Sequence, residues 1–141
     1  MTLPISTYEG VGPLKLGMSQ DEVRKILGTE FETFTNLTVS EMPTDNFVSK
    51  GIHVYYKLPG LCEAIEMFPP ANPTFGEYGL MDMPFSKLLT YFLQEDLSVE
   101  IDDCGLTSRL LGIGLYVPDL HESPESPVKG VIVFEKGYYD A

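Results

Sequence analysis

Histidine and cysteine are the residues of this chain that could supply nucleophilic or acid–base catalysis, and they are few. The 141 residues contain two histidines, His53 and His121, and two cysteines, Cys62 and Cys104. None of the four lies at the spacing of a zinc site. A Cys62–His53 nucleophile pair is one alternative, because both residues fall on adjacent strands of a predicted hairpin. Buried structural cysteines are far commoner than catalytic ones, so we predict no catalytic residue, no metal and no cofactor.

Paired acidic residues do not add a second catalytic candidate. Glu63 and Glu66 lie three apart on a predicted strand, so we expect them on opposite faces of a sheet rather than around a glycosidic bond. Asp102 and Asp103 fall at a predicted turn, where an Asx turn accounts for them better than a metal cage does. Gly10-Val11-Gly12 lacks the spacing of a dinucleotide fingerprint or a P-loop, and we interpret it as a tight turn.

The acidic composition indicates a binding function instead. Asp and Glu number 21 against 9 Lys and Arg, a net charge of -12. Such a charge repels nucleic-acid phosphates and anionic membranes, and it favours a basic protein partner. Tyrosines set among carboxylates would provide a large contact area with a polar tip. The residues expected to contact the partner are three tyrosines and five acids: Tyr55, Tyr116, Tyr138, Glu63, Glu66, Glu100, Asp102 and Asp103.

Two short helices are predicted to position these residues. The first, Ser19–Gly28, begins with Ser19 as N-cap, has Glu22 to complete a capping box and ends at Gly28. The second runs from Pro84, which suits a first helical position, to Gln94. Their apolar faces have helical spacing: Val23, Ile26 and Leu27 in the first helix, and Phe85, Leu88, Leu89 and Phe92 in the second.

Strands are predicted over much of the remaining chain. Gly51–Leu58 and Leu61–Phe68 form a hairpin around a Pro59-Gly60 turn. We further predict four strands and one exposed loop, in order Phe31–Val39, Leu97–Asp102, Leu110–Val117, the loop Asp119–Pro127, and Val128–Glu135. The predicted fold class is α+β: an antiparallel sheet of about six or more strands, with both helices on one face and the opposite face open.

The two halves of the chain correspond at an offset of 65 residues. Leu16-Gly17-Met18 precedes the first helix, and Met81-Asp82-Met83 precedes the second. Three strand-like segments follow each helix. We therefore predict a tandem helix-plus-three-strand repeat, with halves 10–75 and 76–141, within a single domain that spans 1–141.

The chain shows no targeting or membrane signal. Residues 1–9 lack the basic start, apolar run and cleavage site of a signal peptide, and no stretch has the roughly 18 apolar residues of a membrane-spanning helix. We therefore expect a cytoplasmic protein whose two cysteines are free thiols.

The segment Gly10–Gly28, GVGPLKLGMSQDEVRKILG, resembles the opening of small helix-plus-sheet domains in outer-membrane-assembly lipoproteins. Its tandem form resembles the β-lactamase inhibitor proteins. The stretches Asp103–Ser108, Gly112–Tyr116 and Gly130–Tyr139 are similar to small bacterial immunity proteins of toxin–immunity systems. This last resemblance implies an acidic cytoplasmic protein that binds a toxin domain and blocks it. Without a lipoprotein cysteine or a secretion signal, membrane assembly and extracellular inhibition are not implied.

The sequence thus predicts a non-enzymatic immunity protein that inhibits a basic toxin, such as a nuclease, by occlusion. One alternative is a small enzyme or small-molecule-binding protein with a pocket near Cys62 and His53. Another is a structural module of a larger assembly that uses the open sheet face or an edge strand.

Overall fold

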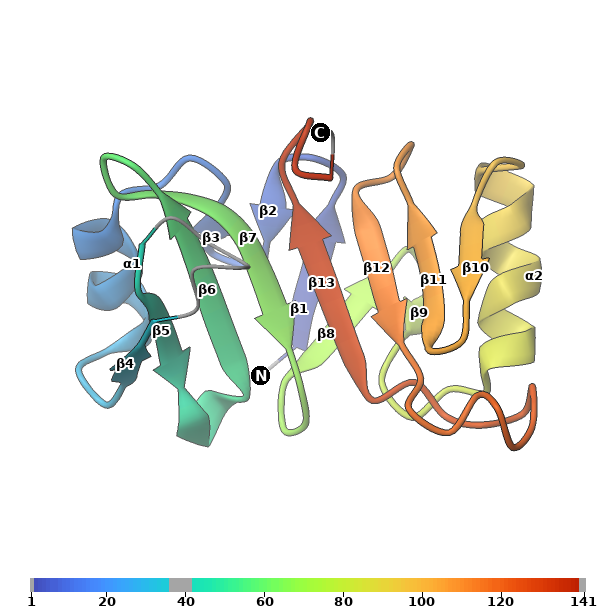
Figure 1. Cartoon of the computed structure of the whole chain (residues 1–141). Helices are drawn as coiled ribbons and strands as arrows, with labels where there is room; N and C mark the ends of the chain where they lie inside the picture. The colour runs from blue at the N-terminus through green and yellow to red at the C-terminus, as the bar shows by residue number, and fades with distance from the viewer. Residues whose placement is uncertain (1, 36–41, 140–141) are drawn as a thin grey trace.

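The computed structural model describes residues 2–35 and 42–139. Within them the chain forms two α-helices and two β-sheets (Figure 1), which confirms the predicted α+β class. The larger sheet has eight strands in the order β10-β11-β12-β13-β7-β6-β5-β4, and every neighbouring pair is antiparallel. Its strands are β4 (Glu32–Phe34), β5 (Thr44–Phe47), β6 (Ile52–Lys57), β7 (Leu61–Met67), β10 (Glu100–Asp102), β11 (Gly105–Ser108), β12 (Ile113–Tyr116) and β13 (Gly130–Phe134).

The smaller sheet was not predicted. It has the order β3-β2-β1-β8-β9, and its strands β1 and β8 are parallel. Its strands are β1 (Thr2–Ser6), β2 (Gly10–Val11), β3 (Leu14–Lys15), β8 (Asn72–Phe75) and β9 (Tyr78–Gly79). Three of these strands have only two residues, too few to show an alternating pattern in the sequence.

Both helices lie on one face of the eight-stranded sheet, as predicted. Figure 1 shows α1 (Gln20–Leu27) and α2 (Phe85–Glu95) at opposite ends of that sheet, with the small sheet behind it and between them. One buried cluster joins these layers: Leu3, Val11 and Leu14 from the small sheet, Val23 and Leu27 from α1, Leu88 and Phe92 from α2, and Ile52, Ile65 and Val131 from the large sheet. We call this the inner face of the large sheet and the opposite side the outer face.

Helix α1 has the predicted capping box. The Glu22 backbone N–H donates to Ser19 Oγ at 3.2 Å, and the Ser19 N–H donates to Glu22 Oε1 at 3.1 Å. Gly28 ends the helix with a φ of 98°. Ile26 is 41% exposed, however, so the apolar stripe is narrower than predicted and consists of Val23 and Leu27.

Helix α2 starts one residue later than predicted. Pro84 is its N-cap, with extended backbone angles, and no side chain caps the helix. The buried residues of α2 are Phe85, Leu88 and Phe92, which are three of the four predicted for its apolar face. Among the described residues, neither helix is long and apolar enough to cross a lipid bilayer.

The two halves of the chain repeat their backbone contacts at the offset found in the sequence. The recurring contacts are Met18 N–Lys15 O with Met83 N–Leu80 O, Cys62 N–Met18 O with Val128 N–Met83 O, and the bridge Ser19–Leu61 with the bridge Pro84–Pro127. Four strands follow each helix rather than three, because β5 and β11 were missed in the sequence. The two four-stranded units meet at β7 and β13, which gives the large sheet an internal two-fold symmetry.

The other predicted strands are present with shifted ends. The hairpin β6–β7 forms as expected, with a register shift between Tyr55 and Tyr56. Strand β4 covers Glu32–Phe34 of the predicted Phe31–Val39, and residues 36–39 lie outside the described residues. The segment predicted as Leu97–Asp102 becomes extended only from Glu100.

Candidate functional site

The structure does not bring the candidate nucleophile pair together. Cys62 is fully buried in the inner core, whereas His53 lies on the outer face, with its ring centroid 5.6 Å from Phe34 and 5.1 Å from Phe68. The proposed pocket near Cys62 and His53 is therefore wrong. Burial raises the pKa of the Cys62 thiol to about 12, which opposes the thiolate at neutral pH. His121 is exposed in the loop before β13.

A buried carboxylate on the inner face has a structural arrangement of partners. Asp45 is fully buried and accepts hydrogen bonds from Arg24 Nε and Nη2, both at 2.9 Å. It also accepts from the Tyr56 hydroxyl at 2.9 Å and from Thr33 Oγ1 at 3.3 Å. These donors occupy both carboxylate oxygens, as a buried charge requires. Within residues 2–35 and 42–139, no group of three or more His, Cys, Asp or Glu side chains could hold a metal ion.

Most of the predicted partner-binding residues lie on the outer face. Strand register separates them from the core-facing residues, because side chains alternate along each strand. The outward positions include Tyr55 on β6, Glu66 on β7, Glu100 and Asp102 on β10, and Tyr116 on β12.

The outer face over β6, β7 and β13 is covered by an aromatic cluster. Tyr138 stacks on Phe134 with ring centroids 5.8 Å apart and packs against Tyr55. Tyr55 is therefore only 8% exposed, and its predicted role as a contact anchor is wrong. Its hydroxyl donates to Glu66 Oε1 at 2.5 Å. Burial, and then Glu66, raises the pKa of the Tyr55 phenol.

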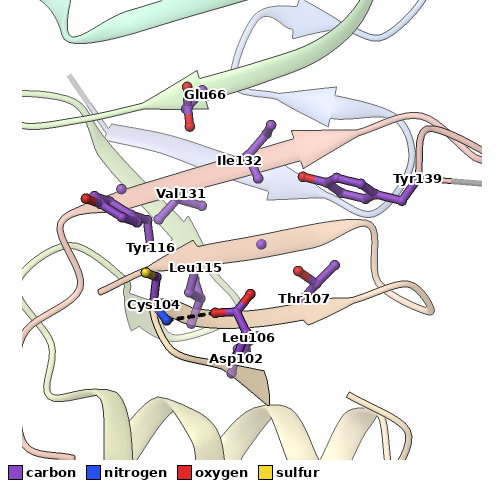
Figure 2. Close-up of a pocket in the computed structure, with 12 residues that line it drawn as sticks. Glu66, Asp102, Cys104, Leu106, Thr107, Leu115, Tyr116, Val131, Ile132 and Tyr139 are labelled. Atoms are coloured by element: carbon purple, nitrogen blue, oxygen red, sulfur yellow. Dashed lines mark hydrogen bonds between the residues drawn. The ribbon is translucent and has the colours of Figure 1, made fainter. Parts of the chain in front are cut away.

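The outer face over β11, β12 and β13 instead contains a groove with a volume of about 180 Å³. Figure 2 shows Tyr116 and Tyr139 at its two ends and Glu66 and Asp102 on its two sides. The remaining lining residues are Cys104, Leu106, Thr107, Gly114, Leu115, Gly130, Val131 and Ile132. None of the lining residues is a lysine, arginine or histidine, so the groove has anionic and aromatic groups only.

Two strand glycines keep this groove open. Neither Gly114 nor Gly130 has a positive φ, so backbone conformation does not require glycine at either position. A Cβ at Gly114 would lie 2.8 Å from Ile132 Cγ2, and a Cβ at Gly130 would lie 3.1 Å from Phe68 Cε1. Glycine inside a strand costs stability, so the missing side chains matter here as open space. The sequence analysis placed Gly114 inside a strand but did not identify the groove.

The two carboxylates of the groove are only partly satisfied. Glu66 accepts the Tyr55 bond through Oε1, and Asp102 Oδ1 accepts from the Cys104 N–H at 2.8 Å, the predicted Asx turn. Among the described residues, Glu66 Oε2 and Asp102 Oδ2 have no hydrogen-bond partner. Burial, then Glu66 and Asp102, raises the pKa of Tyr139, and only the Arg109 guanidinium opposes this effect. The electrostatic field at the groove is therefore negative.

The other predicted acids are placed differently. Glu100 pairs with Arg109 at 2.6 Å on the exposed edge strand. Asp103 is exposed in the turn between β10 and β11. The predicted separation of Glu63 from Glu66 on opposite faces does not hold electrostatically, because both carboxylates raise the pKa of Tyr138 after burial and Tyr139. The register shift in the hairpin breaks strict alternation near Glu63.

Comparisons of the chain with models of protein families, with curated proteins and with solved structures gave no match.

Proposed function

We propose that this chain is a non-enzymatic acidic binding protein that inhibits a basic toxin domain, such as a nuclease, by occlusion. The observation that carries this proposal is the outer face of the large sheet. There, the described residues leave a groove open between two tyrosines and two partly satisfied carboxylates. A surface of this kind suits a cationic protein patch.

Electrostatics supports a fast encounter with such a partner. A net charge of -12 on 141 residues produces a long-range field that attracts cations. Negative groups concentrated on one sheet face then orient the partner, since complementary charges raise association rates and disfavour wrong partners. A toxin must be captured before it acts, so a fast association rate suits an inhibitor.

The aromatic residues support a contact that lasts after the encounter. Tyr116 is 45% exposed and Tyr139 is equally exposed, on either side of the groove. Tyrosine is enriched among residues that dominate binding energy, because it buries a large apolar ring while its hydroxyl keeps a hydrogen bond. In this proposal Tyr116 replaces the buried Tyr55 as the main anchor.

The test is binding to the purified basic toxin domain encoded beside the gene, measured by calorimetry, together with inhibition of that domain's activity. We expect tight binding that weakens as salt rises. Asp102→Lys with Glu66→Lys should weaken it by about 10- to 100-fold. The matched control is Glu77→Lys, an equal change in charge per site in the turn between β8 and β9, which should weaken binding much less.

Three results would overturn the proposal. The first is that no toxin domain is encoded there, and the second is that such a domain fails to bind. The third is binding that neither salt nor the two outer-face substitutions affect.

A further inference from the structure

The groove on the outer face has the groups that recognise an organic cation. Carboxylates attract the charge, and the faces of tyrosine rings attract cations through their quadrupoles. Tyr116 and Tyr139 are at the ends of the groove, and Glu66 and Asp102 are on its sides (Figure 2). The lining combines these with an apolar floor of Gly114, Ile132 and Val131, which suits the methylene part of a long side chain.

The size of the groove limits what it can hold. Its volume of about 180 Å³ is below the roughly 300 to 1,000 Å³ of typical sites for small molecules. It is open on one side, so a side chain that projects from a second protein can enter from above. Four inter-strand spacings, about 19 Å, separate the backbones of β7 and β10, so a planar cation fits between the two carboxylates.

We infer that this groove is the subsite for one arginine side chain of the basic partner. The inference rests on the proposed function and specifies its central contact. Arginine fits better than lysine because its planar guanidinium stacks on aromatic rings and directs several N–H donors toward carboxylate oxygens. The free Oε2 of Glu66 and Oδ2 of Asp102 are acceptors of the required kind.

The internal symmetry supports a specific role for the open floor. His53 lies opposite Glu66 in the first half of the sheet, and Gly114 lies opposite Ile132 at the equivalent position of the second half. In the first half the imidazole ring, with Phe34 and Phe68 against it, occupies this space. The groove therefore exists because the second half has glycine where the first half has an aromatic ring.

The test uses Nα-acetyl-L-arginine methylamide as the probe and the isosteric, uncharged citrulline derivative as its control. Backbone amide shifts are followed by NMR as each compound is added. We expect the arginine probe to move the amides of Gly114, Gly130 and Thr107, and to bind at least about tenfold more tightly than the citrulline probe. The lysine derivative should bind between the two.

Two kinds of variant separate shape from charge. Gly114→His copies the first half of the sheet and fills the floor without removing a charge, and Asp102→Asn with Glu66→Gln removes charge with little change in shape. Each should weaken arginine binding about tenfold. Glu77→Gln is the matched control and should leave it unchanged. If Gly114→His unfolds the chain, Gly114→Ala adds a single methyl group and should still weaken binding.

The inference is overturned if citrulline and arginine probes bind equally, or if Gly114→His retains full arginine binding. These results are distinguishable from failure of the proposed function. A toxin domain that binds in a charge-dependent way although the arginine probe does not bind removes the subsite alone. An arginine probe that binds although no toxin domain does removes the proposed function alone.

Discussion

The two halves of the eight-stranded sheet share a backbone but use their outer faces differently. In the first half, the outward position opposite Glu66 has His53, whose ring packs against Phe34 and Phe68. In the second half, the equivalent position has Gly114, and a groove lies above it. One duplicated framework thus supports a filled surface and a hollowed one, and the difference arises from side-chain size at a few outward positions.

The inner face shows a parallel difference. In the first half, Asp45 lies opposite Val54 and is paired with Arg24, whereas in the second half Leu106 lies opposite Leu115 at the equivalent position. A buried ion pair on one side corresponds to an aliphatic contact on the other. This comparison can be broken or sharpened by substitution, and the following expectations run from the largest effect to the smallest.

The largest effect is expected for Asp45→Asn. The substitution leaves the part-buried Arg24 guanidinium without its charged partner and weakens the bonds from Tyr56 and Thr33. Removal of one member of a buried pair costs about 3 to 5 kcal/mol, and the 30% exposure of Arg24 places the loss near about 3 kcal/mol. Urea denaturation followed by circular dichroism measures it. Asp102→Asn on the groove side is the control and should change the free energy of unfolding by less than about 0.5 kcal/mol. An equal loss in both variants would contradict the contrast.

Much of the repeated framework was predictable from the sequence, because it depends on local signals. Ser19 and Glu22 form a capping box, Pro59-Gly60 forms a hairpin turn, and the offset of 65 residues locates the second unit. The functional surface was not predictable in the same way. Gly114 identifies a groove only when register shows that it points outward and what its neighbours are.

Other errors have equally specific causes. Tyr55 is buried because Tyr138, more than 80 residues later in the chain, folds back over it, and no local pattern indicates such a contact. The acids Glu66 and Asp102 were identified by type and charge, but their position on either side of one groove depends on the order of β7, β13, β12, β11 and β10.

The next largest effect is expected for Gly105→Ala at the start of β11. Gly105 has a φ of 149°, and an added Cβ would lie 1.8 Å from the Leu115 carbonyl oxygen. Its equivalent in the first half is Thr44, which has a side chain and is fully buried. We expect a loss of about 2 kcal/mol in the free energy of unfolding, from backbone strain and displacement of the β11–β12 pairing. Gly114→Ala serves as control and should cost less than half as much; a cost equal to that of Gly105→Ala would show that strain is not the cause.

The aromatic cover of the first half predicts sensitivity to alkali. Burial raises the pKa of Tyr55, Tyr56 and Tyr138 above the usual value of about 10. The unfolded chain then loses these protons first, so stability is constant below about pH 10 and falls as pH rises above it, by up to about 1.4 kcal/mol per pH unit for each tyrosine. Chemical denaturation between pH 8 and pH 11, flagged here as roughly the accessible range, measures the slope. Tyr55→Phe should reduce that slope by about one proton, and an unchanged slope would contradict the contribution of this residue.

The smallest effect is expected at the helix starts, where the two units again differ. Ser19 caps α1 through its hydroxyl, whereas the equivalent Pro84 has no side-chain cap and relies on its fixed φ to begin α2. Ser19→Ala removes the bond to the Glu22 N–H and should cost about 1 kcal/mol in thermal or urea unfolding. Pro84→Ala has no cap bond to lose and should cost less. If the two substitutions cost the same, the capping box would not account for the stability of α1, and packing of Val23 and Leu27 against the core would be its main source.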